Sequence, residues 1–243
     1  MSLQLSSRKS LKSCNTETNS DSKTKIYNLI ILDKSGSMAA IRQEAISGLN
    51  ETLSSIRATQ LRFIESQEHY VSLAAFCSCG IDMIYDAVEI KEAANLMRHR
   101  YEPCCCTPLY DAIGTTVNTL KNKIAEKGED ASVLVTIITD GYENSSKEWT
   151  SKTISKLIED CKEEGWVFSF IGAGEDILKT AKTISIDNTM LWENTPEGTE
   201  KMFCAENNAR FDFCKSLEAS CFNDFSREEK LAMRKRLAKE YYK

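Results

Sequence analysis

The most informative stretch of the chain is IYNLIILDKSGSM, residues 26–38. Its first seven residues are nearly all apolar and rich in β-branched side chains, which is typical of a strand buried on both faces of a sheet. Asp33, Ser35 and Ser37 then follow at alternate positions, and Gly36 eases a turn between the two serines. The stretch therefore predicts a central strand that ends in a loop of oxygen-bearing side chains.

Similar apolar runs recur along the chain and alternate with helical patterns. The runs predict further strands at 70–76, 81–85, 133–139, 166–171 and 190–192. Apolar residues at every third or fourth position predict helices at 41–56, 90–99, 109–124, 154–161 and 175–183. This alternation is typical of an α/β fold, a Rossmann-like, doubly wound and mostly parallel sheet with helices on both faces. The hairpin-like pair of strands around Gly80 adds one antiparallel edge strand.

The composition divides the chain into three regions. Residues 1–24 are rich in Ser, Thr, Lys and Asn, which predicts a disordered or loosely attached arm. Residues 25–222 hold the alternating pattern and form one domain. Residues 223–243 predict a basic amphipathic helix that begins at a capping box, Ser226 to Glu229. Such a helix either binds an acidic partner surface or packs its apolar edge on its own domain.

Charge and hydropathy exclude several classes of protein. The 243 residues carry 31 basic and 36 acidic side chains, a net charge of −5, which argues against a nucleic-acid partner. No stretch approaches the roughly 18 apolar residues of a membrane-spanning helix. The N-terminus lacks the apolar core of a secretory signal. We therefore expect a cytoplasmic protein with no membrane partner and with its ten cysteines reduced.

Oxygen-bearing side chains follow two predicted strands and precede one helix. They are Asp33, Ser35, Ser37, Thr107 and Asp140. In open α/β sheets the carboxyl ends of the strands form the ligand-binding edge, so we expect the three loops to meet there. Mg²⁺ prefers an octahedron of oxygen ligands and usually keeps a position for water or an external ligand. The five residues are therefore candidate metal ligands.

Each of these residues also has a simpler interpretation. Ser35 and Ser37 can cap the helix that follows them. Thr107 stands directly before Pro108, a common pair of residues at the start of a helix. Asp140 with Gly141 is an ordinary turn at the end of a strand.

The order of these residues resembles a known family. Asp33-x-Ser35-x-Ser37, the later Thr107 and the sequence Thr139-Asp140-Gly141 are similar to the von Willebrand factor A domain, whose signature is a metal-ion-dependent adhesion site. The resemblance implies Mg²⁺ or Mn²⁺ held by the five candidate ligands. The strings IILDKSGSM, TPLYDAIG, VLVTIITDGYENSS and GWVFSFIGAGED look like intracellular bacterial and phage versions of the domain.

The resemblance implies a binding module rather than an enzyme. The bound ion would keep one coordination position for an Asp or Glu carboxylate of a protein partner. The alternative is a Mg²⁺-dependent phosphohydrolase with Asp33 as nucleophile. Such enzymes usually have a second Asp two residues later as acid and base, where this chain has Ser35. His69 and His99 lack triad-like neighbours, so we expect packing or surface roles for them.

Five of the ten cysteines gather in two places. Cys77 and Cys79 lie two apart in a predicted strand and would face the same side. Cys104, Cys105 and Cys106 are contiguous, in a loop where the resembling family commonly has glycine before the threonine. The Cys-x2–4-Cys spacing of thiolate zinc sites is absent. A small buried apolar side chain is the default role for a free cysteine, with redox or soft-metal chemistry as the alternative.

Overall fold

A computed structural model describes residues 23–173, 175–220 and 224–243, and the side chains of residues 175–177 are not described. The predicted arm, residues 1–24, lies outside the described residues apart from its last two. The second of these, Thr24, begins the first strand.

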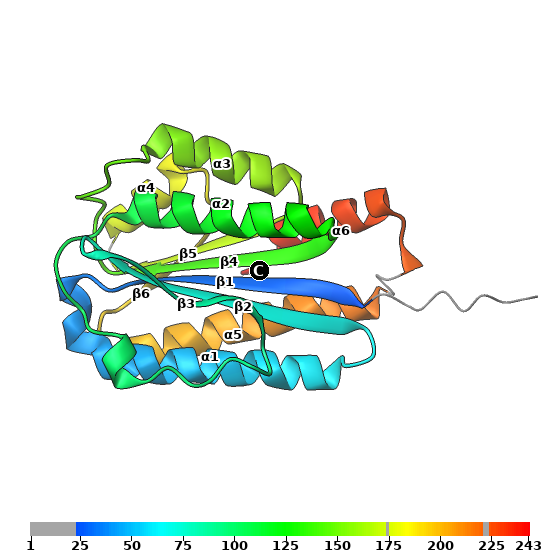
Figure 1. The fold of residues 1–243 in the computed structure, drawn as a ribbon, viewed down its shortest axis with the longest axis horizontal. Coiled ribbons are helices and arrows are strands. Elements are labelled where there is room, and N and C mark those ends of the chain that lie inside the picture. Colours follow the sequence, from blue (N-terminus) through cyan, green and yellow to red (C-terminus); the bar gives the residue numbers. More distant parts are fainter. Residues whose placement is uncertain (1–22, 174, 221–223) are drawn as a thin grey trace, which may run out of the picture.

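Six strands form one sheet in the order β3-β2-β1-β4-β5-β6 (Figure 1). Their bounds are β1 Thr24–Asp33, β2 Gln67–Cys77, β3 Gly80–Glu89, β4 Ala131–Thr139, β5 Val167–Ala173 and β6 Asn188–Trp192. Only β2 and β3 pair antiparallel, and every other neighbouring pair is parallel. The predicted α/β class, with one antiparallel edge strand, is confirmed.

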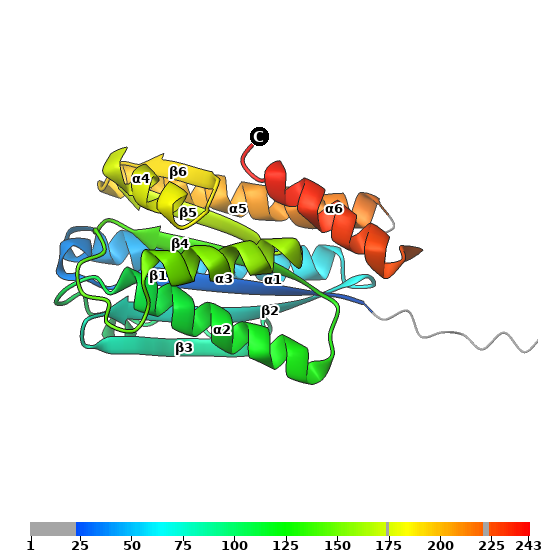
Figure 2. The same ribbon diagram turned by 90° about the horizontal axis from the view of Figure 1, so that it is seen from above.

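Helices cover both faces of the sheet. On one face lie α1 (Arg42–Arg62) and α5 (Pro196–Ala219), and on the other lie α2 (Leu109–Lys127), α3 (Ser151–Glu163) and α4 (Glu175–Thr183) (Figures 1 and 2). The helices α1 and α5 pack closely at Gly48, where a Cβ atom would lie 2.0 Å from the ring of Phe203. The helices α2 and α3 enclose the other half of the core with Ile113 and Ile158, both fully buried.

The predicted helix at residues 90–99 is wrong. The segment is a turn followed by irregular chain, with only a short 3-10 helix at Arg98–Arg100. Asn50 of α1 binds both backbone groups of Leu96, accepting from its amide at 2.6 Å and donating to its carbonyl at 3.2 Å. Arg57 donates to the carbonyl of Ala93. Side chains of α1 thus satisfy backbone groups that a helix would have satisfied internally.

The C-terminal helix α6 (Arg227–Lys239) begins at Ser226, which forms the expected capping box with Glu229. Its buried residues Met233 and Leu237 share an apolar cluster with Phe213 of α5 and Val167 of β5. Arg234 is 4% exposed and donates to Asp130 at 2.7 Å. The apolar edge of α6 thus packs on the rest of the chain. Among the described residues, no helix is both long and apolar enough to cross a membrane.

Candidate metal centre

Asp33 is the last residue of β1 and is fully buried. One carboxylate oxygen, Oδ1, accepts from the backbone amide of Ser35 at 2.6 Å, and Oδ2 accepts from the Thr139 hydroxyl at 2.6 Å. Burial raises the pKa of Asp33 to about 6, although the hydrogen bonds from Thr139 and Ser35 oppose the shift. The structure therefore fixes both oxygens of this carboxyl group at the strand end.

Ser35 and Ser37 present their hydroxyls side by side, with the two Oγ atoms 3.2 Å apart. Ser37 donates to Oδ1 of Asp140 at 2.6 Å. Ser35 stands at the start of the 3-10 helix Gly36–Ile41, but its side chain caps no backbone amide there. The capping interpretation of these two residues is therefore not supported, because the serine hydroxyls point toward each other and toward Asp140.

Asp140 follows β4 directly and is half-buried. Its second oxygen, Oδ2, accepts from the side-chain amide of Asn194 at 2.6 Å. Burial raises its pKa, and the hydrogen bonds from Ser37 and Asn194 act in the opposite direction. Asn194 lies between β6 and α5, so Asp140 connects the loop after β1 with the segment that leads into α5.

Thr107 is 3% exposed and lies in the loop before α2. Asn144 holds its backbone: the Thr107 amide donates to Asn144 Oδ1 at 2.9 Å, and the Asn144 amide donates to the Thr107 carbonyl at 3.1 Å. A Cβ at Gly141 would lie 2.7 Å from Thr107 Oγ1 and 3.4 Å from Asp33 Oδ2. Both oxygens therefore face the small space beside Gly141. The helix α2 begins after Pro108 without a side-chain cap, so the capping interpretation of Thr107 is wrong.

Backbone hydrogen bonds tie the loop before Thr107 to the loop after β1. The amide of Gly36 donates to the Cys105 carbonyl at 3.1 Å, and the amide of Cys104 donates to the Lys34 carbonyl at 2.8 Å. Tyr101, which is fully buried, donates from its hydroxyl to the Asp33 carbonyl at 2.6 Å. These bonds fix how the Thr107 loop lies against Asp33.

The donor set fits a hard divalent cation. Two carboxylates and three hydroxyls are all oxygen donors, and no nitrogen or sulfur atom belongs to the predicted set. The residues come from three separate loops and converge at the carboxyl ends of two neighbouring strands, β1 and β4. The convergence is a finding, whereas the role of the five residues as metal ligands stays a prediction.

Four further residues shape this cluster and were not among the predicted ligands. Thr139 and Asn194 orient the two carboxylates, Asn144 fixes the Thr107 backbone, and Gly141 leaves the space that Thr107 faces. Thr139 and Gly141 flank Asp140 in sequence, so their neighbourhood was a usable indication. No feature of the sequence indicated Asn194, because only the folded sheet brings the end of β6 beside Asp140.

The sequence itself matches no known family and no curated protein. The structure, however, is similar to solved ones. The pilus adhesin SpaC from Lactobacillus rhamnosus GG, in its open conformation, aligns with a TM-score of 0.56 and 13% identity, covering 77% of this chain and 30% of that one. Proximal thread matrix protein 1 from the mussel byssus, with a zinc-occupied metal-ion-dependent adhesion site (MIDAS) motif, aligns with a TM-score of 0.53 and 12% identity. The alignment covers 78% of this chain and 46% of that one.

The strand order, the single antiparallel edge and these similarities agree. The chain has the fold of a von Willebrand factor A domain. It spans less than half the length of the two solved chains described above. At these identities the similarity establishes the fold alone.

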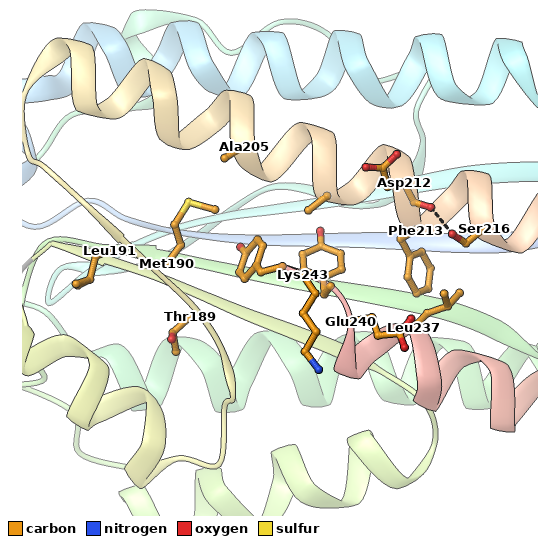
Figure 3. A pocket seen from close by; sticks show the side chains of 13 residues that line it. Thr189, Met190, Leu191, Ala205, Asp212, Phe213, Ser216, Leu237, Glu240 and Lys243 are labelled. Atoms are coloured by element: carbon orange, nitrogen blue, oxygen red, sulfur yellow. Dashed lines mark hydrogen bonds between the residues drawn. The ribbon is translucent and has the colours of Figure 1, made fainter.

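A cavity of about 880 Å³ lies elsewhere on this von Willebrand factor A fold, between α5, β6 and the C-terminal residues (Figure 3). Met190 and Phe213 line it, together with Tyr241 and Lys243. None of the five candidate ligands lines this cavity. The oxygen cluster at the strand-end edge is thus separate from this cavity.

Proposed function

We propose that this von Willebrand factor A domain is a metal-dependent protein-binding module. In this proposal Mg²⁺ or Mn²⁺ is held by the five candidate ligands, Asp33, Ser35, Ser37, Thr107 and Asp140, and the partner contributes an Asp or Glu carboxylate. The observation that carries the proposal is the continuous chain of contacts from Asp33 through Ser35 and Ser37 to Asp140.

The chemistry of the five side chains supports this proposal. When bound, a divalent cation supplies positive charge and a coordination position for an anionic oxygen. Three of the five donors are neutral hydroxyls, so the protein contributes only the two negative charges of Asp33 and Asp140, which balance the charge of a divalent ion without exceeding it. The MIDAS motif of the mussel byssus protein holds zinc, which agrees with a divalent ion at this edge of the fold.

The surface around the cluster supports a protein partner. Ser37 is exposed and Asp140 is half-buried, whereas Asp33, Ser35 and Thr107 are buried. A partner would therefore approach over Ser37 and Asp140. Tyr142 lies two residues after Asp140 and is 54% exposed, and exposed aromatic side chains often contribute strongly to protein interfaces.

The experiment that tests the function is affinity capture from a cell extract on the immobilised full chain. We expect a partner that is retained in Mg²⁺, released by EDTA and competed by a soluble carboxylate such as acetate at high concentration. The Asp140→Ala chain, prepared identically, should retain little of it. Retention that is indifferent to EDTA, or equal on the variant, would contradict a metal-bridged contact.

A further inference from the structure

Four cysteine sulfurs converge beside the Thr107 loop. The Sγ atoms of Cys77 and Cys104 are 3.3 Å apart, those of Cys79 and Cys105 are 3.3 Å apart, and those of Cys104 and Cys79 are 3.9 Å apart. The sulfurs of Cys77, Cys79 and Cys104 all lie within 4.8 Å of one another. All four residues are free thiols.

The four residues come from two segments that hydrogen bonds hold together. Cys77 ends β2 and Cys79 lies in the turn to β3, while Cys104 and Cys105 lie in the loop before α2. The amide of Ser78 donates to the Cys106 carbonyl at 2.9 Å, and the Cys106 amide donates to Ser78 Oγ at 3.1 Å. These bonds hold the two segments side by side independently of any bond between the sulfurs.

The spacing of the Cys77, Cys79 and Cys104 sulfurs fits three corners of a tetrahedral thiolate site, and the Cys105 sulfur, which contacts that of Cys79 but lies outside this group, would have to move closer to take the fourth. Zn–S bonds of about 2.3 Å place the ligand sulfurs of a tetrahedron about 3.8 Å apart. The separations of 3.3 Å between Cys77 and Cys104 and 3.9 Å between Cys104 and Cys79 lie on either side of that value. The Cys104 sulfur contacts the sulfurs of both Cys77 and Cys79, which favours one shared centre over two separate cysteine pairs.

The backbone of Cys105 provides an independent observation. Its φ is +59°, in the left-handed region that glycine adopts without strain and that other residues seldom adopt. Such strain is typically found at functional sites. A cysteine at this position places its thiol against the thiol of Cys79, which a glycine could not do.

We propose that Cys77, Cys79, Cys104 and Cys105 form a second metal site, specific for a thiophilic divalent cation such as Zn²⁺. Four thiolates select a soft or borderline ion, in contrast to the oxygen donors around Asp33. Binding would replace the thiol protons by the metal and release them to solvent. Cys77 is buried and the other three are partly or fully exposed, so the ion can enter from the surface. It would cross-link the β2–β3 turn to the loop that carries Thr107.

The test is anaerobic titration of the reduced full chain with Co²⁺, followed by competition with Zn²⁺. We expect one Co²⁺ per chain with thiolate charge-transfer absorption and the intense visible bands of a tetrahedral site, both abolished by Zn²⁺.

The exposed ligands allow substitution without disturbing the core. Cys79→Ser and Cys104→Ser should each weaken Zn²⁺ binding by at least about 100-fold, because removing a ligand costs more than removing its supporting partner.

Three control variants separate this site from other possibilities. Cys106→Ser changes a neighbouring thiol in the same loop, and Cys204→Ser changes an exposed thiol on α5. Both should bind Co²⁺ as the unaltered chain does. Asp140→Ala removes a candidate oxygen ligand and should keep the thiolate absorption, so that failure of the oxygen site leaves this proposal standing.

Several results would overturn the thiolate site. They are the absence of thiolate absorption, an unchanged spectrum in Cys104→Ser, and equal losses in Cys106→Ser. A fourth is the recovery of the four cysteines as disulfides, without zinc, from a chain purified without added reductant. Circular dichroism of each variant should match the unaltered chain, which ties any loss of metal to the missing sulfur.

Discussion

Ser37 Oγ donates a hydrogen bond of 2.6 Å to Oδ1 of Asp140, although 103 residues separate them in sequence. The two strands that precede these residues, β1 and β4, are neighbours in the sheet and run parallel. Their carboxyl ends therefore lie at the same edge, and the loops that follow them meet. The bond shows directly that the Asp-x-Ser-x-Ser loop and the second carboxylate belong to one cluster.

The first prediction concerns binding of the metal at this cluster. Asp140→Ala removes one of the two carboxylates and should weaken Mg²⁺ and Mn²⁺ binding by at least about 10-fold, because carboxylates are the charged donors of the proposed site. Titration calorimetry measures both ions. Glu148→Ala removes an exposed carboxylate outside the five candidate ligands and serves as the control. Equal affinity of the Asp140→Ala and unaltered chains would exclude Asp140 as a ligand.

The second prediction concerns Thr107, which offers a neutral donor. Thr107→Ala removes this donor, and Thr107→Asp adds a third negative group beside Asp33, which would make the ion less attractive to an incoming carboxylate. Both variants should lower EDTA-sensitive capture of the partner by about 10-fold or more while circular dichroism stays unchanged. Thr107→Ser keeps the hydroxyl and should keep the capture. Full capture by both Thr107→Ala and Thr107→Asp would place the partner contact elsewhere.

The third prediction concerns catalysis. Asp33 is fully buried, and Ser35 stands where such phosphohydrolases usually have a second Asp as acid and base, so the chain lacks the proton donor and acceptor for attack on a phosphoryl group. We expect no hydrolysis of p-nitrophenyl phosphate in Mg²⁺ above that of an identically purified Asp33→Asn chain. Turnover that the Asp33→Asn substitution abolishes would support the phosphohydrolase alternative instead.

Much of this fold was predictable because its strands are contiguous apolar runs. The run in β1 and the glycine after α2 at Gly128, which adopts a φ of +64°, are local features that need no tertiary information. The failed helix at 90–99 shows the limit of such patterns. Ile90, Ala93 and Leu96 are buried but Met97 is 60% exposed. Asn50 and Arg57 of α1 supply hydrogen bonds to the backbone of this segment.

The candidate sites were predictable to different degrees for a related reason. The oxygen cluster depends on strand ends that a parallel sheet brings to one edge, so its five members could be proposed from order alone. The sulfur cluster depends on the β2–β3 turn lying against residues 104–105, which no spacing rule describes. Cys104 and Cys105 come close to the pair Cys77 and Cys79 only when the chain is folded.

The fourth prediction concerns a buried ion pair within α5, Glu206 with Arg210, on the side of the helix that contacts the sheet. Glu206 is 1% exposed and accepts from Arg210 at 2.9 Å, Thr136 at 2.7 Å and Tyr241 at 2.9 Å. Glu206→Gln leaves the buried guanidinium of Arg210 without its counter-charge, so we expect a loss of about 3 kcal/mol in the free energy of unfolding. Urea denaturation measures it. Asp160→Asn, in an exposed pair with Lys156, should change stability by less than about 1 kcal/mol. Similar losses in the free energy of unfolding for Glu206→Gln and Asp160→Asn would show that burial does not make the Glu206–Arg210 pair more important for stability.

The last prediction concerns His69, which is 1% exposed in β2. Its Nε2 lies 3.2 Å from Gln67 Oε1, and the Gln67 amide nitrogen donates to the Cys214 carbonyl, so Nε2 carries the proton and donates. Its Nδ1 has no hydrogen-bond partner within the described structure, so a second proton there would find no acceptor. Burial, with a smaller contribution from Arg210, lowers the pKa of His69 to about 4.

The direction of the pH effect follows from this shift. Between about pH 4 and 6.5, His69 is neutral in the folded chain and increasingly protonated in the unfolded chain, so unfolding takes up a proton. The free energy of unfolding should have its highest contribution from His69 above pH 6.5. It should fall as the pH drops, by up to about 3 kcal/mol at pH 4. His69→Gln removes this uptake while keeping a donor toward Gln67. Because Asp33 and the other carboxyl groups titrate in both chains, the difference between the two urea-denaturation curves isolates His69. Curves that stay parallel from pH 7 to pH 4 would show that the imidazole is protonated in the folded chain.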